Sequence, residues 1–282
     1  MNAIIGQPIR RREDIRFITG RGRYTDDVNA AGQTYAAFAR SPHARAKIRS
    51  IDKGSAKAVP GVIAVFTGAD LAAGGIGMLP CGWLVKSTDG SDMKVAPRPP
   101  LAIDQVNFVG EPYAVVIAST PEAAKAGAEA LDADLADLPA QASLATAMEG
   151  VQIHDGIEKN LSFHWAIGDE AKTDAAFKAA SHVTTLTFAN NRLIPNAIEP
   201  RACLASYDAA GDEITLTTTS QNPHVERLIL TAFLNLAPEH KLRVISPDVG
   251  GGFGSKIFVY PEETTVAWAA RAINRPVKWT AE

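Results

Sequence analysis

The 282-residue chain has few cysteines, no large charge excess and no long apolar run. Its two cysteines, Cys81 and Cys203, form no C-x-x-C pair, so this chain alone does not support a zinc site or an iron–sulfur cluster. Lys and Arg number 28 against 31 Asp and Glu, and the formal net charge of -3 argues against nucleic-acid binding. Since no apolar run reaches the roughly 18 residues that cross a bilayer, we expect no transmembrane segment.

The composition is that of a globular protein. Hydrophobic residues make up 46% and charged residues 21%, and the length is that of two domains of ordinary size. Arg10–Arg12 precede an acidic pair instead of an apolar stretch, so we interpret residues 1–18 as a solvated arm and not as an export signal. The low cysteine content fits a reducing compartment, and we expect a cytoplasmic protein.

The first half of the chain alternates strand-like and helix-like segments. Three segments have the composition of strands: 35–39, 46–51 and 61–68. Residues 72–100 are rich in Gly and Pro and predict a long loop. Residues 109–112 predict a turn and 113–118 a central strand. Thr120 as N-cap and Pro121 as first residue then predict an Ala-rich helix.

The second half begins after a turn-rich stretch at 139–162, where we place the domain boundary. Five segments predict strands: 183–188, 202–207, 213–220, 243–249 and 276–280. The turn at 208–212 predicts that 202–207 and 213–220 form a hairpin. Asn222 and Pro223 predict a helix start, followed by an apolar stripe at helical spacing: Val225, Leu228, Ile229 and Ala232. Another helix starts at Pro261. Because the final strand looks buried, we expect the polypeptide to be incomplete without a partner.

The run Gly250-Gly251-Gly252-Phe253-Gly254-Ser255-Lys256 is the sharpest local signal. Glycines permit positive φ angles and close approach to a ligand, and successive N–H groups can bind an anion. The spacing fits neither a phosphate-binding P-loop nor the G-x-G-x-x-G dinucleotide pattern. The residues alone leave a structural turn and an anion or cofactor site equally open.

Gln221 directly precedes the helix predicted at Asn222. Its amide can donate to an oxygen of a ligand near the positive end of the helix dipole. The alternative is that Asn222 caps the helix and Gln221 is a surface amide. The six histidines lack the spacing of a helical metal site, and we expect no direct protein ligand to a metal.

Several motifs, taken in order, resemble one known family. They are Gly6–Arg11, Thr19–Asp27, Arg40–Ala46, Val109–Pro112, Ser220–His224 and Pro247–Lys256. With these motifs the chain resembles the amino-terminal part of the molybdopterin-binding large subunit of the xanthine dehydrogenase/aldehyde oxidase family. Its motifs are most similar to those of the carbon monoxide dehydrogenase-like branch.

The resemblance implies an α/β (α+β) fold and a division of the chain. An α/β hammerhead domain would span residues 19–138, and the first part of a molybdopterin-binding domain would span 150–282. The implied function is a component of a molybdenum hydroxylase, which oxidises an aldehyde, an N-heterocycle or carbon monoxide with oxygen from water. The implied cofactor is molybdenum on molybdopterin, in bacteria often the cytosine dinucleotide form. The [2Fe–2S] clusters and FAD would lie on partner subunits.

Site residues carry over position by position. Gln221 matches a glutamine whose amide hydrogen-bonds an oxo ligand of molybdenum. Gly252, Phe253 and Gly254 match the loop against the metal, where Phe253 helps to exclude water, and Gly251 is taken with them as cofactor-binding. The xanthine-oxidising branch has a glutamate where this chain has Ile257, so we expect an apolar substrate pocket and not a purine.

The family's large subunit is much longer than this chain, and the resemblance places its catalytic base beyond residue 282. We therefore expect an isolated chain to lack turnover and to need a partner carrying the rest of the molybdopterin domain. The alternatives are a non-catalytic fragment or interaction module and, less in keeping with the motif spacing, an unrelated nucleotide-binding protein.

Overall fold

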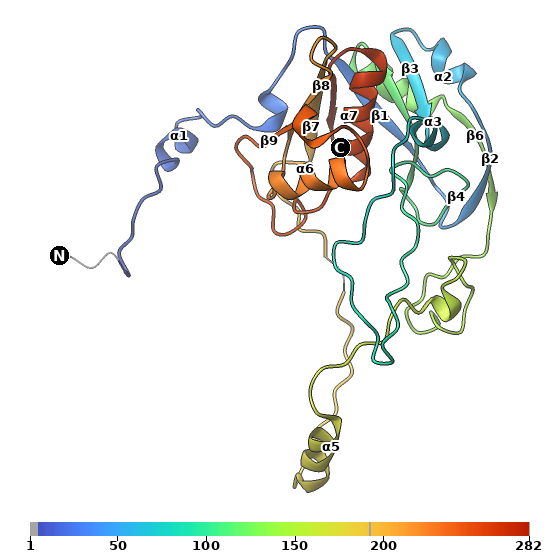
Figure 1. Ribbon diagram of the computed structural model, residues 1–282, viewed down its shortest axis with the longest axis vertical. Helices are drawn as coiled ribbons and strands as arrows, with labels where there is room; N and C mark the ends of the chain where they lie inside the picture. Colours follow the sequence, from blue (N-terminus) through green and yellow to red (C-terminus); the bar gives the residue numbers. More distant parts are fainter. Residues whose placement is uncertain (1–4, 192, 282) are drawn as a thin grey trace.

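A mixed seven-stranded sheet forms the centre of the protein, seen in a computed structural model that describes residues 5–191 and 193–281 (Figure 1). In sheet order the strands are β3 (Val62–Thr67), β5 (Pro112–Ala118), β1 (Thr34–Arg40), β10 (Val277–Thr280), β7 (Ala202–Asp208), β8 (Glu213–Thr218) and β9 (Leu242–Ile245). A second, three-stranded sheet has the order β4 (Gln105–Val106), β2 (Ala46–Asp52) and β6 (Asp132–Asp137).

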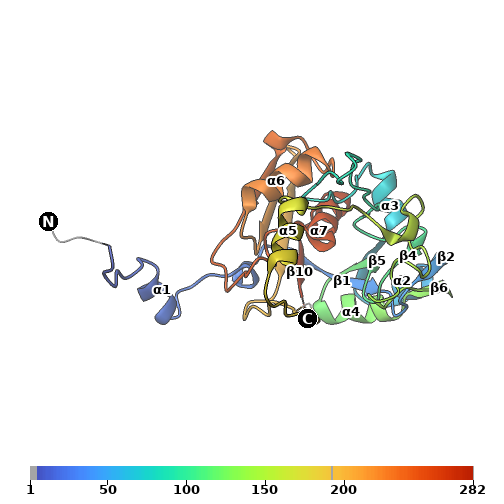
Figure 2. The ribbon, with the colours of Figure 1, turned by 90° about the horizontal axis from the view of Figure 1, so that it is seen from below.

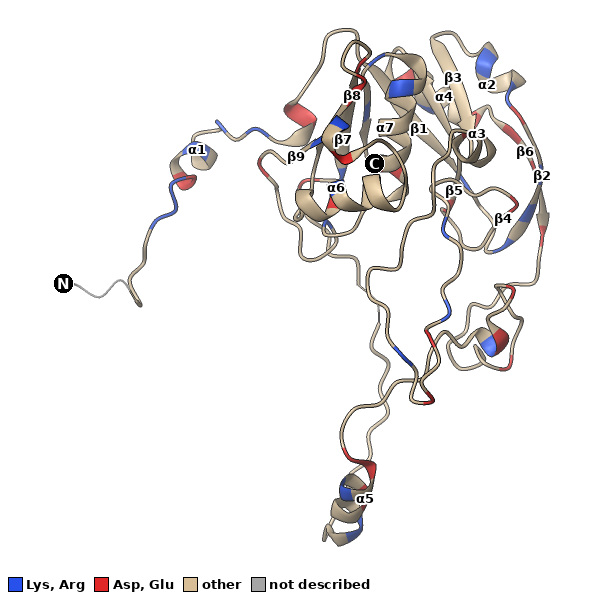
Figure 3. Cartoon of the chain, in the orientation of Figure 1, with Lys and Arg blue, Asp and Glu red and all other residues tan. Residues whose placement is uncertain are grey.

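The helices are α1 (Asp14–Ile18), α2 (Gly54–Ala58), α3 (Gly68–Ala73), α4 (Pro121–Glu129), α5 (Glu170–Ala179), α6 (Pro223–Ala232) and α7 (Pro261–Ile273). Short 3-10 turns lie at η1 (Thr25–Asp27), η2 (Glu158–Asn160) and η3 (Glu239–Lys241). Within the described residues no helix is long and apolar enough to cross a membrane. Lys and Arg positions are interspersed with Asp and Glu positions along the chain (Figure 3).

Strand β5 separates two hydrophobic clusters because successive side chains of a strand point to opposite faces. Val115 and Ile117 pack in the cluster that includes residues of α7, whereas Ala114 and Val116 pack in the cluster that includes residues next to α4. Helices α7 and α4 lie on opposite sides of the sheet (Figure 2). The sheet is therefore covered on both faces, as expected for an α/β layer.

Strand β10 joins the two halves of the chain. It pairs in parallel with β1 from the first half and antiparallel with β7 from the second half. Trp279 packs edge-to-face on Phe38 of β1 with ring centroids 5.8 Å apart. The predicted strand at 276–280 is confirmed, and the predicted domains 19–138 and 150–282 share one continuous sheet.

Local signals predicted most elements of the core. The turn, strand and capped helix at 109–131 are confirmed as β5 and α4, and the Thr120 hydroxyl accepts a hydrogen bond from Ala123 N at 3.1 Å. The hairpin of β7 and β8 and the helix starting at Pro261 are also confirmed. The run at 61–68 forms β3, but this strand is only partly buried. The strand predicted at 243–249 ends at Ile245.

The strand predicted at 183–188 is wrong. These residues form no strand, and the Phe188 side chain is 76% exposed. A strand needs a neighbour to accept its backbone hydrogen bonds, and residues 181–191 pair with none in the part of the chain described. Sequence patterns missed α5, which is capped by Asp169 accepting from Lys172 N at 3.0 Å. Helix α5 and its flanking segments project away from the sheets (Figure 1).

The helix predicted from Asn222 is confirmed as α6, but its apolar stripe is only partly covered. Leu228 is 51% exposed, while Glu226 and Leu230 are the buried residues of the helix. Asn222 stands at the N-cap position without making a side-chain cap. Instead Asn222 N donates to the Ser220 hydroxyl at 3.0 Å. The inner face of the helix carries the buried carboxyl of Glu226, which belongs to a polar network described below.

Candidate functional site

The two segments singled out in the sequence meet at one edge of the large sheet. Strands β8 and β9 are parallel neighbours, with Ile214 beside Leu242 and Thr217 beside Ile245. The carboxyl ends of parallel strands lie at the same edge, where α/β folds commonly bind ligands. The chain leaves β8 toward Gln221 and leaves β9 toward the loop 250–256. The topology thus explains why residues far apart in the sequence come together.

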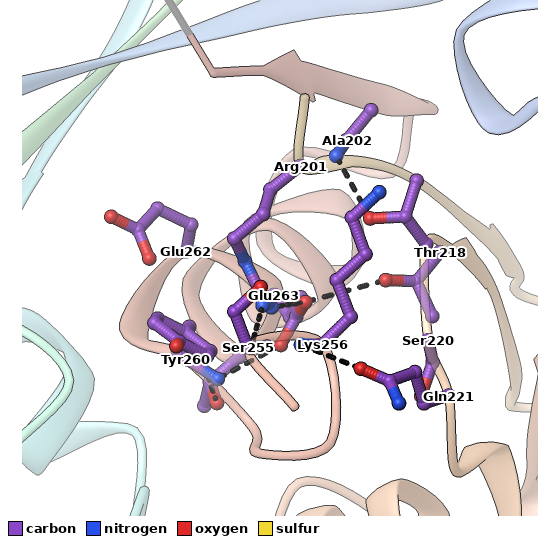
Figure 4. A network of polar contacts seen from close by, with 12 residues as sticks. Arg201, Ala202, Thr218, Ser220, Gln221, Ser255, Lys256, Tyr260, Glu262 and Glu263 are labelled. Carbon is purple, nitrogen blue, oxygen red and sulfur yellow. Dashed lines mark hydrogen bonds and ion pairs between the residues drawn. The ribbon is translucent and has the colours of Figure 1, made fainter. Parts of the chain in front are cut away.

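Gln221 is hydrogen-bonded to this loop through its oxygen. Its Oε1 accepts from Gly254 N at 3.0 Å and from Lys256 N at 3.3 Å (Figure 4). Its backbone N–H donates to the Lys256 carbonyl at 2.8 Å. Because the amide oxygen faces the loop, the Nε2 group points away from it. Nε2 has no acceptor among the described residues and remains a free donor on an exposed side chain.

Two glycines are required for this contact. A Cβ at Gly252 would lie 2.3 Å from Gln221 Oε1 and 2.4 Å from its Cδ, closer than any side chain can approach. Gly251 has a φ of 102°, in the left-handed region that glycine alone enters freely. Gly252 therefore leaves room for the Gln221 side chain, and Gly251 adopts the backbone conformation that the turn of the loop requires.

The middle of the loop exposes backbone donors. The N–H groups of residues 251–253 find no acceptor in the part of the chain that the structure describes. The φ angle is positive at Gly251 (102°), not at Gly252, and positive again at Phe253 (51°), so the backbone alternates over residues 251–253. Such alternation forms a concave nest of N–H groups suited to an anion. Together with Gln221 Nε2, these donors fit a ligand that presents anionic oxygens.

Phe253 and Ile257 are both exposed at this site. The Phe253 side chain is 75% exposed, and Ile257 is 38% exposed. The described residues do not bury the Phe253 ring, and its role in excluding water remains a prediction, as does the role of Ile257 in a substrate pocket.

Sequence reasoning missed a buried ion pair beneath the loop. Lys256 is 2% exposed, and its Nζ donates to the Glu199 carbonyl at 2.8 Å and to Glu199 Oε2 at 3.0 Å. The same carboxylate oxygen accepts from Gly250 N at 2.7 Å. Glu199 thereby contacts both ends of the loop. Its partner is distant in the sequence, so no local pattern could have revealed the pair.

A second ion pair joins Arg201 to Glu263 (Figure 4). Arg201 pairs with the buried Glu263 of α7 and donates from Nη1 to the Ser255 carbonyl at 3.1 Å. Its guanidinium lies over the Tyr260 ring, 3.5 Å from the centroid. Glu263 Oε2 also accepts from Tyr260 N at 2.8 Å. The loop is thus tied to the first turn of α7.

Glu226 of α6 is a further buried carboxyl, close to Glu263. Burial, with the nearby Glu263 carboxylate adding to it, raises the pKa of Glu226 well above its usual range, while Ser220 and Arg201 act in the opposite direction. One carboxyl oxygen, Oε1, is buried and has no hydrogen-bond partner among the described residues. The raised pKa favours a neutral Glu226 within the fold. In the described part of the chain, no cluster of three or more His, Cys, Asp or Glu residues could hold a metal ion.

Two family models match in succession. The aldehyde oxidase and xanthine dehydrogenase a/b hammerhead domain matches residues 19–139, and the molybdopterin cofactor-binding domain matches residues 153–282. Together the two domains define part of a molybdopterin-binding subunit. The chain belongs to the aldehyde oxidase/xanthine dehydrogenase family, as part of its molybdopterin-binding large subunit. The fold class and the family expected from the sequence motifs are confirmed.

Relatives include carbon monoxide dehydrogenase and enzymes acting on N-heterocycles. The carbon monoxide dehydrogenase large chain of Afipia carboxidovorans is 36% identical over 97% of this chain. The nicotine 6-hydroxylase large subunit of Paenarthrobacter nicotinovorans is 34% identical over 99% of it. The solved structure of quinoline 2-oxidoreductase from Pseudomonas putida 86 matches with a TM-score of 0.86 at 34% identity, covering 97% of this chain and 34% of that one.

This chain covers only part of each relative. It spans 34% of the carbon monoxide dehydrogenase large chain and 33% of the nicotine 6-hydroxylase large subunit. These relatives are oxidoreductase subunits by name. The matched part corresponds to a fragment of a large subunit.

Proposed function

We propose that this chain forms part of the cofactor site of a molybdenum hydroxylase, completed by a chain that carries the rest of the molybdopterin domain. One observation carries the proposal: the amide oxygen of Gln221 is held by the N–H of Gly254, so that its Nε2 donor is turned outward beside free backbone donors. This donor set fits a molybdopterin group, whose oxygens are anionic.

The proposed roles follow from the geometry of the chain. Gln221 orients the bound group by donating from Nε2, and the N–H groups of the loop supply further donors. Gly251, Gly252 and Gly254 let the backbone approach closely, while Phe253 shields the bound group from water in the completed subunit. The cofactor, when bound, supplies the oxidative hydroxylation chemistry, and the protein supplies position and electrostatics.

The substrate belongs to the aldehydes, the N-heterocycles other than purines, or carbon monoxide. Ile257 presents an apolar side chain at the end of the loop, where a glutamate would be needed to hydrogen-bond a purine. Relatives acting on carbon monoxide and on nicotine, a nitrogen heterocycle, support this range.

The remaining parts of the enzyme lie outside this chain. We propose a molybdopterin cytosine dinucleotide as the cofactor form, with [2Fe–2S] and FAD subunits as partners that accept the electrons. We place the assembly in the cytoplasm, in keeping with two cysteines that are both free.

Native mass spectrometry of the protein purified from its own source tests the proposal. We expect a large complex that contains this 29.9 kDa chain, further subunits and molybdopterin. A cofactor-free species of the chain's own mass would contradict the proposal and favour a non-catalytic fragment or interaction module.

Gln221→Ala tests the role of the side chain within the assembled enzyme. We expect turnover to fall much more than the free energy of unfolding, because Gln221 is exposed and its contacts are few. Gln152→Ala removes another exposed glutamine, outside the loop, and serves as the matched control. Equal losses of fold and activity in Gln221→Ala would show that the residue is structural.

A further inference from the structure

We propose that Glu199, Arg201, Lys256 and Glu263 are positioning residues that set the orientation of the Gln221 amide. None of them needs to touch the cofactor. They fix the two ends of the glycine loop, and the loop in turn fixes Gln221. The inference rests on the proposed function for its purpose, but its geometry can be tested on the chain without any cofactor.

Glu199 fixes both ends of the glycine loop through hydrogen bonds. One carboxylate oxygen accepts from Gly250 N at 2.7 Å, where the loop begins, and from Lys256 Nζ at 3.0 Å, where it ends. Glu199 N also donates to the Gly250 carbonyl at 3.2 Å, and Lys256 Nζ donates to the Glu199 carbonyl at 2.8 Å. A buried charged pair with this many hydrogen bonds has one well-defined geometry.

Arg201 fixes the position of Ser255 through a hydrogen bond to its carbonyl. Its guanidinium pairs with Glu263 and donates to the Ser255 carbonyl at 3.1 Å, and its Cζ lies 3.5 Å from the centroid of the Tyr260 ring. An arginine can make both contacts at once because its donors form a rigid planar fork. The residue immediately before Lys256 is thereby fixed relative to α7.

The loop transmits this placement to Gln221. Its Oε1 accepts from two loop N–H groups, Gly254 at 3.0 Å and Lys256 at 3.3 Å. An amide whose oxygen is held by two donors has its Nε2 direction determined. The side chain is otherwise exposed, so nothing else in the described residues selects this orientation. Loss of the loop's placement should release it.

The chain contains a closely matched control. Arg40 also pairs with a buried glutamate of α7, Glu262, at 2.6 Å, and also donates to a backbone carbonyl, that of Gly110, at 3.2 Å. It differs from Arg201 in contacting no residue of the glycine loop. Arg40→Lys therefore perturbs a similar ion pair on the same helix without perturbing the loop.

The experiment compares Arg201→Lys, Lys256→Met and Arg40→Lys by NMR of the ¹⁵N-labelled full chain. The Gln221 side-chain amide is assigned as the resonance lost in Gln221→Ala. In Arg201→Lys and Lys256→Met we expect this resonance to move, and amide exchange at Gly254 to accelerate roughly tenfold, the factor for one lost hydrogen bond of ordinary strength. In Arg40→Lys we expect neither change.

Unchanged Gln221 and Gly254 signals in a folded Arg201→Lys would overturn the inference, as would equal changes in Arg40→Lys. Arg201→Lys keeps the charge opposite Glu263, so the test survives if Lys256→Met fails to fold. The outcome is independent of molybdopterin. A source protein without cofactor would refute the proposed function and leave the positioning result intact, whereas unmoved signals would refute the positioning alone.

Discussion

Gly252→Ala should displace the Gln221 side chain while leaving the fold nearly intact. The new Cβ would lie 2.3 Å from Oε1, 2.4 Å from Cδ and 2.6 Å from Cγ of Gln221. Turning the terminal amide cannot relieve three consecutive clashes, so the whole side chain must swing away. Gln221 is exposed, and the swing leads into solvent. The variant therefore removes the two hydrogen bonds to Oε1 without inserting a group into the core.

The expected loss of unfolding free energy is small. Two hydrogen bonds contribute about 1 kcal/mol each, and water replaces part of that at an exposed site. Gly252 does not have a left-handed φ, so alanine adds no backbone strain and offsets about 0.4–1 kcal/mol by restricting the unfolded chain. We expect a net loss of about 0–1.5 kcal/mol in urea denaturation, together with a moved Gln221 side-chain amide resonance.

Gly82→Ala is the matched control for Gly252→Ala. Gly82 also lacks a left-handed φ, and the nearest heavy atom to its added Cβ, on Phe258, is 3.8 Å away, an ordinary contact. We expect a change within about 0.5 kcal/mol and no movement of the Gln221 resonance. The reasoning is refuted if Gly252→Ala leaves that resonance in place, or if it destabilises the protein by as much as a core cavity would, about 3 kcal/mol or more.

Three further predictions concern stability. Trp279→Ala should cost about 3–5 kcal/mol in chemical denaturation because the ring is buried in the sheet, whereas Trp83→Ala, at a ring 81% exposed, should stay within about 0.5 kcal/mol. Thr120→Ala should cost about 1 kcal/mol by thermal denaturation because it removes a side-chain cap, and Asn222→Ala should cost less because that residue makes none. Glu226→Gln should be more stable than the parent at neutral pH and equal to it near pH 4, since a raised pKa means that folding favours the protonated form and stability falls as pH rises above the unfolded pKa. Each tenfold change in proton affinity contributes about 1.4 kcal/mol to the pH dependence of stability. If the unfolding free energies of the two proteins differ by the same amount at every pH from 4 to 8, the prediction for Glu226 is contradicted.

The sequence predicted the parts of the fold that local chemistry determines. The cap at Thr120 and the proline that follows it determine where α4 begins, and the short turn before 213–220 supplies this strand with its partner at 202–207. The strand predicted at 183–188 failed because β-propensity needs a pairing strand, and the described residues offer none there. The apolar stripe predicted helix α6 but did not reveal its inner face, where the carboxyl of Glu226 is buried beside other charged groups.

The sequence predicted which residues form the candidate site, but not the buried ion pairs that hold them in place. Gln221 and the glycine run stand out as residue types suited to a ligand, and parallel pairing of β8 and β9 brings them together. Glu199 and Lys256 lie 57 residues apart, and nothing in either segment indicates that the two charges are buried against each other. Charged residues are rarely buried, so a prediction from sequence patterns assigns them to the surface.

The placement of these charges explains how the glycine loop can be held firmly and still expose unpaired N–H groups. Removing one partner of a buried pair costs about 3–5 kcal/mol, because the remaining charge is left uncompensated. Glu199 with Lys256, and Arg201 with Glu263, therefore hold the loop strongly at residues 250, 255 and 256. The intervening residues 251–253 need contribute no hydrogen bonds of their own to stability. Their N–H groups can stay unpaired within the fold and available to a ligand, which a loop stabilised along its whole length could not offer.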